Sequence, residues 1–117
     1  MTPEINPFDV QVRLGEYVVM VQEKIDSYWK AMDFTFADPP LVTVEYGKKY
    51  ARIVKNDDLN GSRSVHTFIN MLNGDILKGN WKTPVRTKKG LAVRGNIFGD
   101  DLGADRVNEH GPNYLRR

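Results

Sequence analysis

The sequence contains no cysteine, only two histidines and no long apolar run. Without cysteine, the chain forms no disulfide bond and no thiolate metal site. A membrane-spanning helix needs about 20 consecutive apolar residues, and a signal peptide needs a basic start before an apolar core. Neither pattern is present, so we expect a soluble, cytoplasmic protein that does not associate with membranes.

Acidic residues are missing from one long segment. The 117 residues carry 17 Lys and Arg against 15 Asp and Glu, a formal charge of +2 that does not by itself indicate a nucleic-acid binder. From Lys78 to Arg94, however, there are six basic residues and no acidic one. The distribution of charge therefore says more about function than its sum.

The N-terminal part predicts one long helix at residues 6–33, after a loose start at 1–5. Asn6, Pro7 and Asp9 are typical of a helix start, and Pro39 and Pro40 cannot continue one. Apolar residues recur at spacings of three and four along one face: Leu14, Val18, Val21, Ile25, Tyr28 or Trp29, and Met32. We expect the polar side of this helix to be exposed to solvent, with Glu16, Gln22, Glu23, Asp26 and Lys30.

Four short runs of β-branched and aromatic residues follow, at 41–46, 49–55, 63–70 and 75–78. Turn-forming clusters separate them, and Asn73-Gly74 favours a tight hairpin. Because neither face of 63–70 is cleanly polar, we expect that strand to be central and covered on both sides. Either the C-terminal segment or another subunit would supply the second cover.

From Gly79 onward, glycine and proline recur every few residues, which predicts a basic loop and an extended tail over 79–117. Ile97 and Phe98 are apolar enough to dock onto the sheet. The predicted fold is α+β, with residues 1–117 forming a single domain. In it, one long N-terminal helix packs on a four-stranded antiparallel sheet that carries an irregular C-terminal extension.

Five segments, taken in order, resemble a known group of proteins: Tyr50–Val54, Arg63–Ile69, Asn73–Ile76, Lys78–Pro84 and Arg94–Phe98. The group consists of short uncharacterised proteins encoded by tailed bacteriophages and abundant in marine environmental sequence. The resemblance spans roughly residues 41–98 and implies a viral origin. It supplies no catalytic residue.

The acid-free segment is the first candidate site. Lysine and arginine neutralise phosphates, and an exposed indole stacks on bases, so this combination is typical of single-strand binders. The residues concerned are Lys78, Trp81, Lys82, Arg86, Lys88, Lys89 and Arg94. The structural alternative is that Trp81 belongs to the core and the lysines provide solubility.

Two further groups of residues are candidate sites, but each has a simpler structural explanation than a catalytic or metal-binding role. His66 is a candidate general base, with Asp57, Asp58 or Asp75 nearby. A histidine with a purely structural role is the commoner case. Carboxylates and a histidine in the tail offer ligands to a divalent cation: Asp100, Asp101, Asp105, Glu109 and His110. They do not match a calcium loop, so we expect a solvated tail and predict no metal and no cofactor.

The leading functional hypothesis is a non-enzymatic bacteriophage accessory protein that binds nucleic acid in the host cytoplasm. The alternative is a protein-interaction module, or a modifier of a host protein, acting through an apolar face. The apolar stripe of the helix is wider than four strands can cover, which favours a homo-oligomer. An enzyme ranks third, because no motif indicates a mechanism built on Asp, Glu or Lys.

Overall fold

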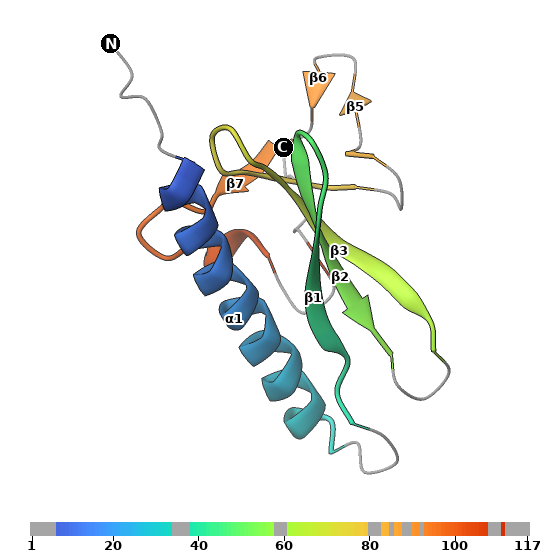
Figure 1. The fold of residues 1–117 in the computed structure, drawn as a ribbon. Helices are drawn as coiled ribbons and strands as arrows, with labels where there is room; N and C mark the ends of the chain where they lie inside the picture. Colours follow the sequence, from blue (N-terminus) through green and yellow to red (C-terminus); the bar gives the residue numbers. More distant parts are fainter. Residues whose placement is uncertain are drawn as a thin grey trace.

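The computed structural model describes residues 7–33, 38–57, 61–79, 83–84, 86–87, 90–91, 93–107 and 111 (Figure 1). Helix α1 (Pro7–Ala31) lies along one side of an antiparallel sheet whose strand order is β1-β2-β3-β4-β7. The strands are β1 (Leu41–Tyr46), β2 (Tyr50–Asn56), β3 (Arg63–Asn70), β4 (Asp75–Leu77) and β7 (Val93–Asn96). A separate ladder joins β5 (Arg86–Thr87) to β6 (Gly90–Leu91), and the 3-10 helix η1 (Ala104–Arg106) follows β7.

The predicted helix on an antiparallel sheet is confirmed, but the predicted number of four strands is wrong. The fifth strand, β7, pairs with β4 through Asp75 with Asn96 and Ile76 with Gly95. Four residues of mixed polarity, including a glycine, show no alternation that a sequence could reveal. The C-terminal extension is therefore partly regular, because the open edge of β4 gives it a partner.

The core lies between α1 and one face of the sheet, which we call the inner face. Its helix residues are spaced by three and four and are almost fully buried: Val10, Leu14, Tyr17, Val21 and Ile25. They pack against Ala51, Ile53, Ile69 and Ile76 of the sheet. Each such side chain contributes roughly 1.5–3 kcal/mol by leaving water. Ile97 and Val107 complete the cluster, so the docking predicted for Ile97 is confirmed.

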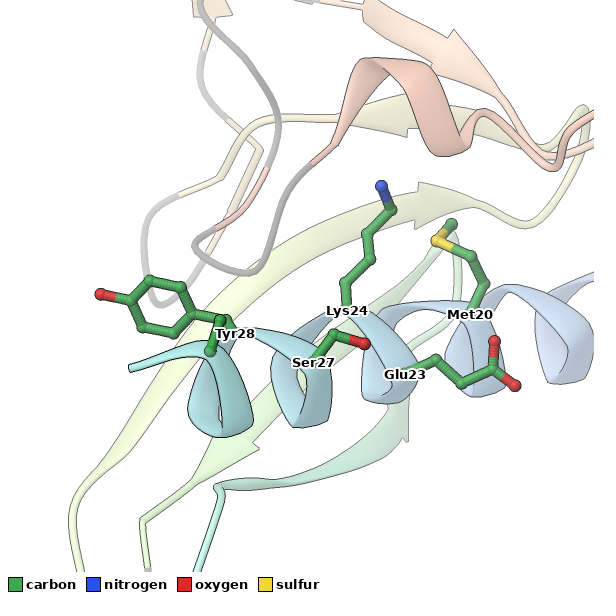
Figure 2. Close-up of a pocket in the computed structure, with 6 residues that line it drawn as sticks. Met20, Glu23, Lys24, Ser27 and Tyr28 are labelled. Carbon is green, nitrogen blue, oxygen red and sulfur yellow. The ribbon is translucent and has the colours of Figure 1, made fainter. Parts of the chain in front are cut away.

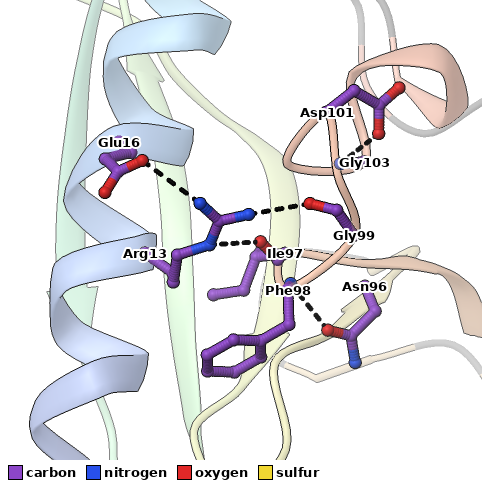
Figure 3. Close-up of polar contacts among 8 residues, drawn as sticks. All are labelled: Arg13, Glu16, Asn96, Ile97, Phe98, Gly99, Asp101 and Gly103. Carbon is purple, nitrogen blue, oxygen red and sulfur yellow. Dashed lines mark hydrogen bonds and ion pairs between the residues drawn. The ribbon is translucent and has the colours of Figure 1, made fainter.

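Two polar side chains hold α1 in place on the sheet. Arg13 Nε donates to the Ile97 carbonyl at 3.0 Å and Nη2 donates to that of Gly99 at 2.7 Å (Figure 3). Gln22 Oε1 accepts from the Val42 amide at 2.8 Å, and its Nε2 donates to the Pro40 carbonyl at 2.9 Å. Gln22 is therefore half-buried against the edge of β1, which corrects its predicted position in solvent.

The opposite face of the sheet, which we call the outer face, carries one row of residues across all five strands: Glu45, Arg52, Phe68, Leu77 and Val93. Phe68 and Leu77 are buried although α1 lies on the other side. Gly79 lies two residues beyond Leu77, and a Cβ added there would come within 2.1 Å of the Phe68 ring, so this ring packs directly on the glycine. Residues 66–70 of β3 are buried on both faces of the sheet, as predicted.

No helix among the described residues combines the length and apolar character that crossing a membrane requires.

Arg13→Ala tests how α1 is fastened. It removes two charge-assisted hydrogen bonds to carbonyl groups, and we expect the free energy of unfolding to fall by about 2–3 kcal/mol in urea titrations. Glu16→Gln is the control, because it removes only the 3.3 Å ion pair with Arg13 on the surface and should cost less than about 0.5 kcal/mol. Equal effects of the two substitutions would contradict the assignment.

Candidate nucleic-acid interface

The structure describes three of the seven residues predicted to contact nucleic acid. Lys78 directly follows β4 and is half-buried, and Arg94 lies on β7, which pairs with β4. These two therefore lie on neighbouring strands. Arg86 belongs to β5 and only its backbone is described. Trp81, Lys82, Lys88 and Lys89 fall outside the described residues, so a single patch formed by all seven stays a prediction.

Acidic and basic residues are distributed unequally between two layers of the molecule. The helical layer comprises α1 with residues 32–33 and 38–40, together with 97–107. Its described residues include nine acidic ones, Asp9, Glu16, Glu23, Asp26, Asp33, Asp38, Asp100, Asp101 and Asp105, against Arg13, Lys24, Lys30 and Arg106. The sheet layer comprises the other described residues. It carries Lys48, Lys49, Arg52, Lys55, Arg63, Lys78, Arg86 and Arg94 against only Glu45, Asp57 and Asp75.

The β1–β2 hairpin concentrates part of this positive charge. Lys48 and Lys49 form its exposed turn, which closes through a 2.9 Å hydrogen bond from the Gly47 amide to the Tyr50 carbonyl. Beside the turn is a hollow of about 170 Å³, lined by Glu45, Tyr46, Gly47, Lys48, Lys49, Tyr50, Arg52 and Phe68. Sequence reasoning treated this stretch as a turn only. The signal that would have found it is two lysines, a tyrosine and an arginine within five residues.

Glu45 does not cancel the charge of this region. Its carboxylate accepts a short hydrogen bond from Arg63 Nη2, and its Oε1 lies 3.6 Å from Arg52 Nε. One acidic group therefore meets two guanidinium groups, and the lysines of the turn add to the excess. Ion pairs this exposed contribute little to stability, so their arrangement matters for the surface potential rather than for the fold.

Two buried atoms of the outer face lack a hydrogen-bond partner in the described part of the chain: Tyr50 Oη and Arg94 Nε. Arg94 faces outward because the next residue, Gly95, directs its Cβ position toward Ile76 and Arg106 on the inner face. Both groups are hydrogen-bond donors. Buried polar groups are normally paired, so these two atoms cost free energy in the folded protein.

His66 belongs to a buried structural network. It is only 2% exposed, and its Nδ1 lies 2.6 Å from Thr67 Oγ1, which in turn lies 2.9 Å from Tyr17 Oη. This chain of contacts joins β3 to α1 through the core. Burial raises the pKa of the Tyr17 phenol, while the bond to Thr67 opposes the rise. The buried, hydrogen-bonded interpretation of His66 is therefore confirmed. Asp58, one of its proposed partners, lies outside the described residues.

The acidic residues after β7 serve the local backbone. Asp101 Oδ1 accepts from the Gly103 amide at 3.0 Å, and Oδ2 accepts from the Asp105 amide at 3.2 Å. These bonds, with that from Asp105 first, lower the pKa of Asp101. Within the described ranges, no three acidic or histidine side chains come together as ligands for a metal ion. Glu109 and His110 fall outside those ranges.

A second hollow, of about 560 Å³, runs along the C-terminal half of α1 (Figure 2). Its described lining consists of Met20, Glu23, Lys24, Ser27, Tyr28 and Ala31, all from one helix. Figure 2 shows the labelled side chains fanning outward instead of converging on a common point. Glu23 and Lys24 also offset each other in charge, so this groove is a weaker candidate than the hairpin.

A model of a protein family matches residues 10–109. The chain belongs to DUF7717, a family of unknown function. The match covers α1 from Val10 onward, all five strands of the sheet and η1, and so extends beyond residues 41–98 at both ends. No curated protein and no solved structure matches the chain. The function of this DUF7717 member must therefore be argued from its own surface.

Alkaline unfolding tests the Tyr17 network. Because the pKa of Tyr17 is higher in the folded state than the ordinary value of 10.0, its contribution to stability is complete below pH 10 and is lost as the pH rises above it. Tyr17→Phe should cost about 1 kcal/mol at neutral pH. Its unfolding free energy should then fall less than that of the unmodified protein above pH 10. Identical alkaline profiles would contradict a buried, protonated Tyr17.

Proposed function

We propose that this DUF7717 protein binds nucleic acid through its sheet layer, with the β1–β2 hairpin and Arg94 contacting phosphates. The observation that carries the proposal is the opposite charge of the two layers. A polyanion is attracted to the sheet layer and repelled by the helical layer, so its approach is oriented. The acid-free segment predicted from the sequence begins and ends in the same layer, at Lys78 and Arg94.

The proposed binding is governed by the phosphate backbone rather than by base sequence. An α-helix or a two-stranded β-ribbon reads bases in a major groove, and the tip of the β1–β2 hairpin offers two lysines, which act on phosphates as point charges. The described α1 buries one face against the sheet, and it carries Asp9, Glu16, Glu23 and Asp26. We therefore expect little sequence preference and a steep dependence of affinity on salt.

The proposal extends to biological context. The order of segments from Tyr50 to Phe98 resembles that of tailed-bacteriophage proteins, which supports an accessory role in an infected bacterial cell. Nucleic acid is the ligand class that such a small, basic-faced protein would meet in the host cytoplasm.

Charge reversal at the hairpin tests the binding proposal. Lys48→Glu with Lys49→Glu should lower the affinity for labelled oligonucleotides at least about tenfold at low salt, because two phosphate contacts become repulsive. Fluorescence anisotropy with single- and double-stranded DNA measures this. The control is Lys24→Glu with Lys30→Glu, which makes the same charge change on α1. Equal losses in the two variants, or affinity insensitive to salt, would contradict the proposal.

A second candidate is self-association through the outward side of α1. Phe8, Val12 and Val19 are all exposed there, at 69%, 46% and 57%. With Gly15 they follow spacings of four, three and four, the pattern of a helix-pairing seam. A Cβ at Gly15 would meet nothing within 4 Å, so the monomer does not need a glycine that costs about 1 kcal/mol. A second helix approaching closely does need it.

The charges favour an antiparallel pair of α1 helices. The same outward line continues through Glu23, Asp26 and Lys30. A parallel pair would place each of these opposite its own copy, which is repulsive. An antiparallel pair centred near Gly15 instead brings Glu23 to the first turn of the partner's helix, where the helix dipole is positive. We therefore propose a weak, concentration-dependent antiparallel dimer.

Sedimentation velocity tests the dimer. The protein should associate at high micromolar concentration, and Val12→Glu should keep it monomeric, because a charge in the seam cannot be desolvated without a partner. Ser27→Glu, which adds the same charge on another side of α1, should leave association unchanged. A protein that stays monomeric at every concentration would exclude this candidate without affecting the first.

A further inference from the structure

The exposed seam of α1 and the basic sheet layer lie on opposite sides of the molecule. At about 100° per residue, Val12, Gly15 and Val19 lie roughly 150° around the helix from the buried residues that contact the sheet. Both valines are exposed, and a Cβ at Gly15 would meet nothing within 4 Å. A partner helix packed on this seam therefore leaves the β1–β2 hairpin accessible.

Pairing two copies along this seam would produce four layers in the order sheet, helix, helix, sheet. Figure 1 shows α1 along one side of the sheet, so the second copy would lie beyond the helix, with its own sheet on the far side. Packed layers lie about 10 Å apart, so roughly 30 Å would separate the two sheets. The Debye length is about 8 Å at physiological salt, so polyanions bound to the two sheets would hardly repel each other.

The charges keep the two sheet layers as separate binding surfaces. The described helical layer carries nine acidic residues against four basic ones, whereas the described sheet layer carries eight basic against three acidic. In the paired arrangement, both acidic layers lie between the basic ones. A strand that ran from one sheet layer to the other would have to cross this acidic zone, which repels it. Each sheet layer would therefore hold a strand of its own.

We propose that two copies of this protein, paired through α1, bridge two nucleic-acid strands. This inference rests on the proposed nucleic-acid binding and on the α1 dimer. Bridging requires the second copy, because each protomer contributes one basic layer. Since the binding is governed by the phosphate backbone, the two strands need no common sequence, and they are either separate molecules or distant parts of one molecule.

Energy transfer between two oligonucleotides tests bridging. Short, non-complementary strands, one labelled with a donor dye and the other with an acceptor, are mixed with the protein above its dimerisation concentration. Energy transfer should appear, and it should decline again when the protein is in excess, because each strand then occupies a dimer of its own. Precipitation by charge neutralisation would not depend on the seam, so variants of α1 separate it from bridging.

Val12→Glu separates bridging from binding. It places a charge in the seam, so energy transfer should fall to background. Anisotropy should show a single-strand affinity within about twofold of that of the unmodified protein, because the change lies on the side of α1 away from the sheet layer. Ser27→Glu is the matched control and should bridge normally.

Gly15→Gln shows whether a loss of bridging could arise from unfolding. Its side chain prevents the close approach of a second helix, so bridging should be lost. Its melting temperature should rise, because glutamine favours a helix more than glycine does. A stabilised variant that binds one strand and does not bridge two excludes unfolding as the cause.

The outcomes distinguish bridging from binding itself. Energy transfer that persists in Val12→Glu overturns bridging and leaves the proposed function standing. So does the absence of energy transfer from an unmodified protein that binds oligonucleotides, or a protein that stays monomeric in sedimentation. If the unmodified protein binds no oligonucleotide, the proposed function fails and bridging fails with it.

Discussion

The packing of α1 against the inner face decides what the rest of this molecule presents to its surroundings. Burial of five apolar side chains at helical spacing drives this packing. Arg13 and Gln22 fix the orientation of α1, because they form hydrogen bonds with backbone groups at opposite edges of the sheet. The Gln22 amide also occupies part of the open edge of β1, where another strand would otherwise pair. With the helix fixed on the inner face, α1 leaves the outer face and the β1–β2 hairpin uncovered.

The consequence is a small protein with two electrically different sides. Its net charge of +2 conceals an acidic helical layer and a basic sheet layer. Donors without acceptors, Tyr50 Oη and Arg94 Nε, occur on the outer face of the basic layer. Unpaired buried donors reduce stability. The basic charge of the sheet layer is the feature on which the proposed binding of a polyanion rests.

Much of the fold could be predicted because its signals are local. The 3.6-residue period of α1, the proline pair after it and the Asn73-Gly74 turn gave the helix and four strands close to their observed limits. β7 could not be predicted, since its pairing depends on the edge of β4 and on Gly95 rather than on its own pattern. For the site, the sequence placed Lys78 and Arg94 in one basic segment. It did not single out the hairpin as a site, because the positions of Glu45 and Phe68 on either side of Arg52 arise from strand register.

Amide chemical shifts recorded during titration with a short oligonucleotide test the central claim most directly, namely that its excess of positive charge makes the sheet layer the binding surface. The account predicts that shifts concentrate at residues 47–52 and 93–96, weaken together as salt is added, and leave the outward side of α1 unchanged. Shifts that instead follow α1, or that spread evenly over both layers, would contradict it.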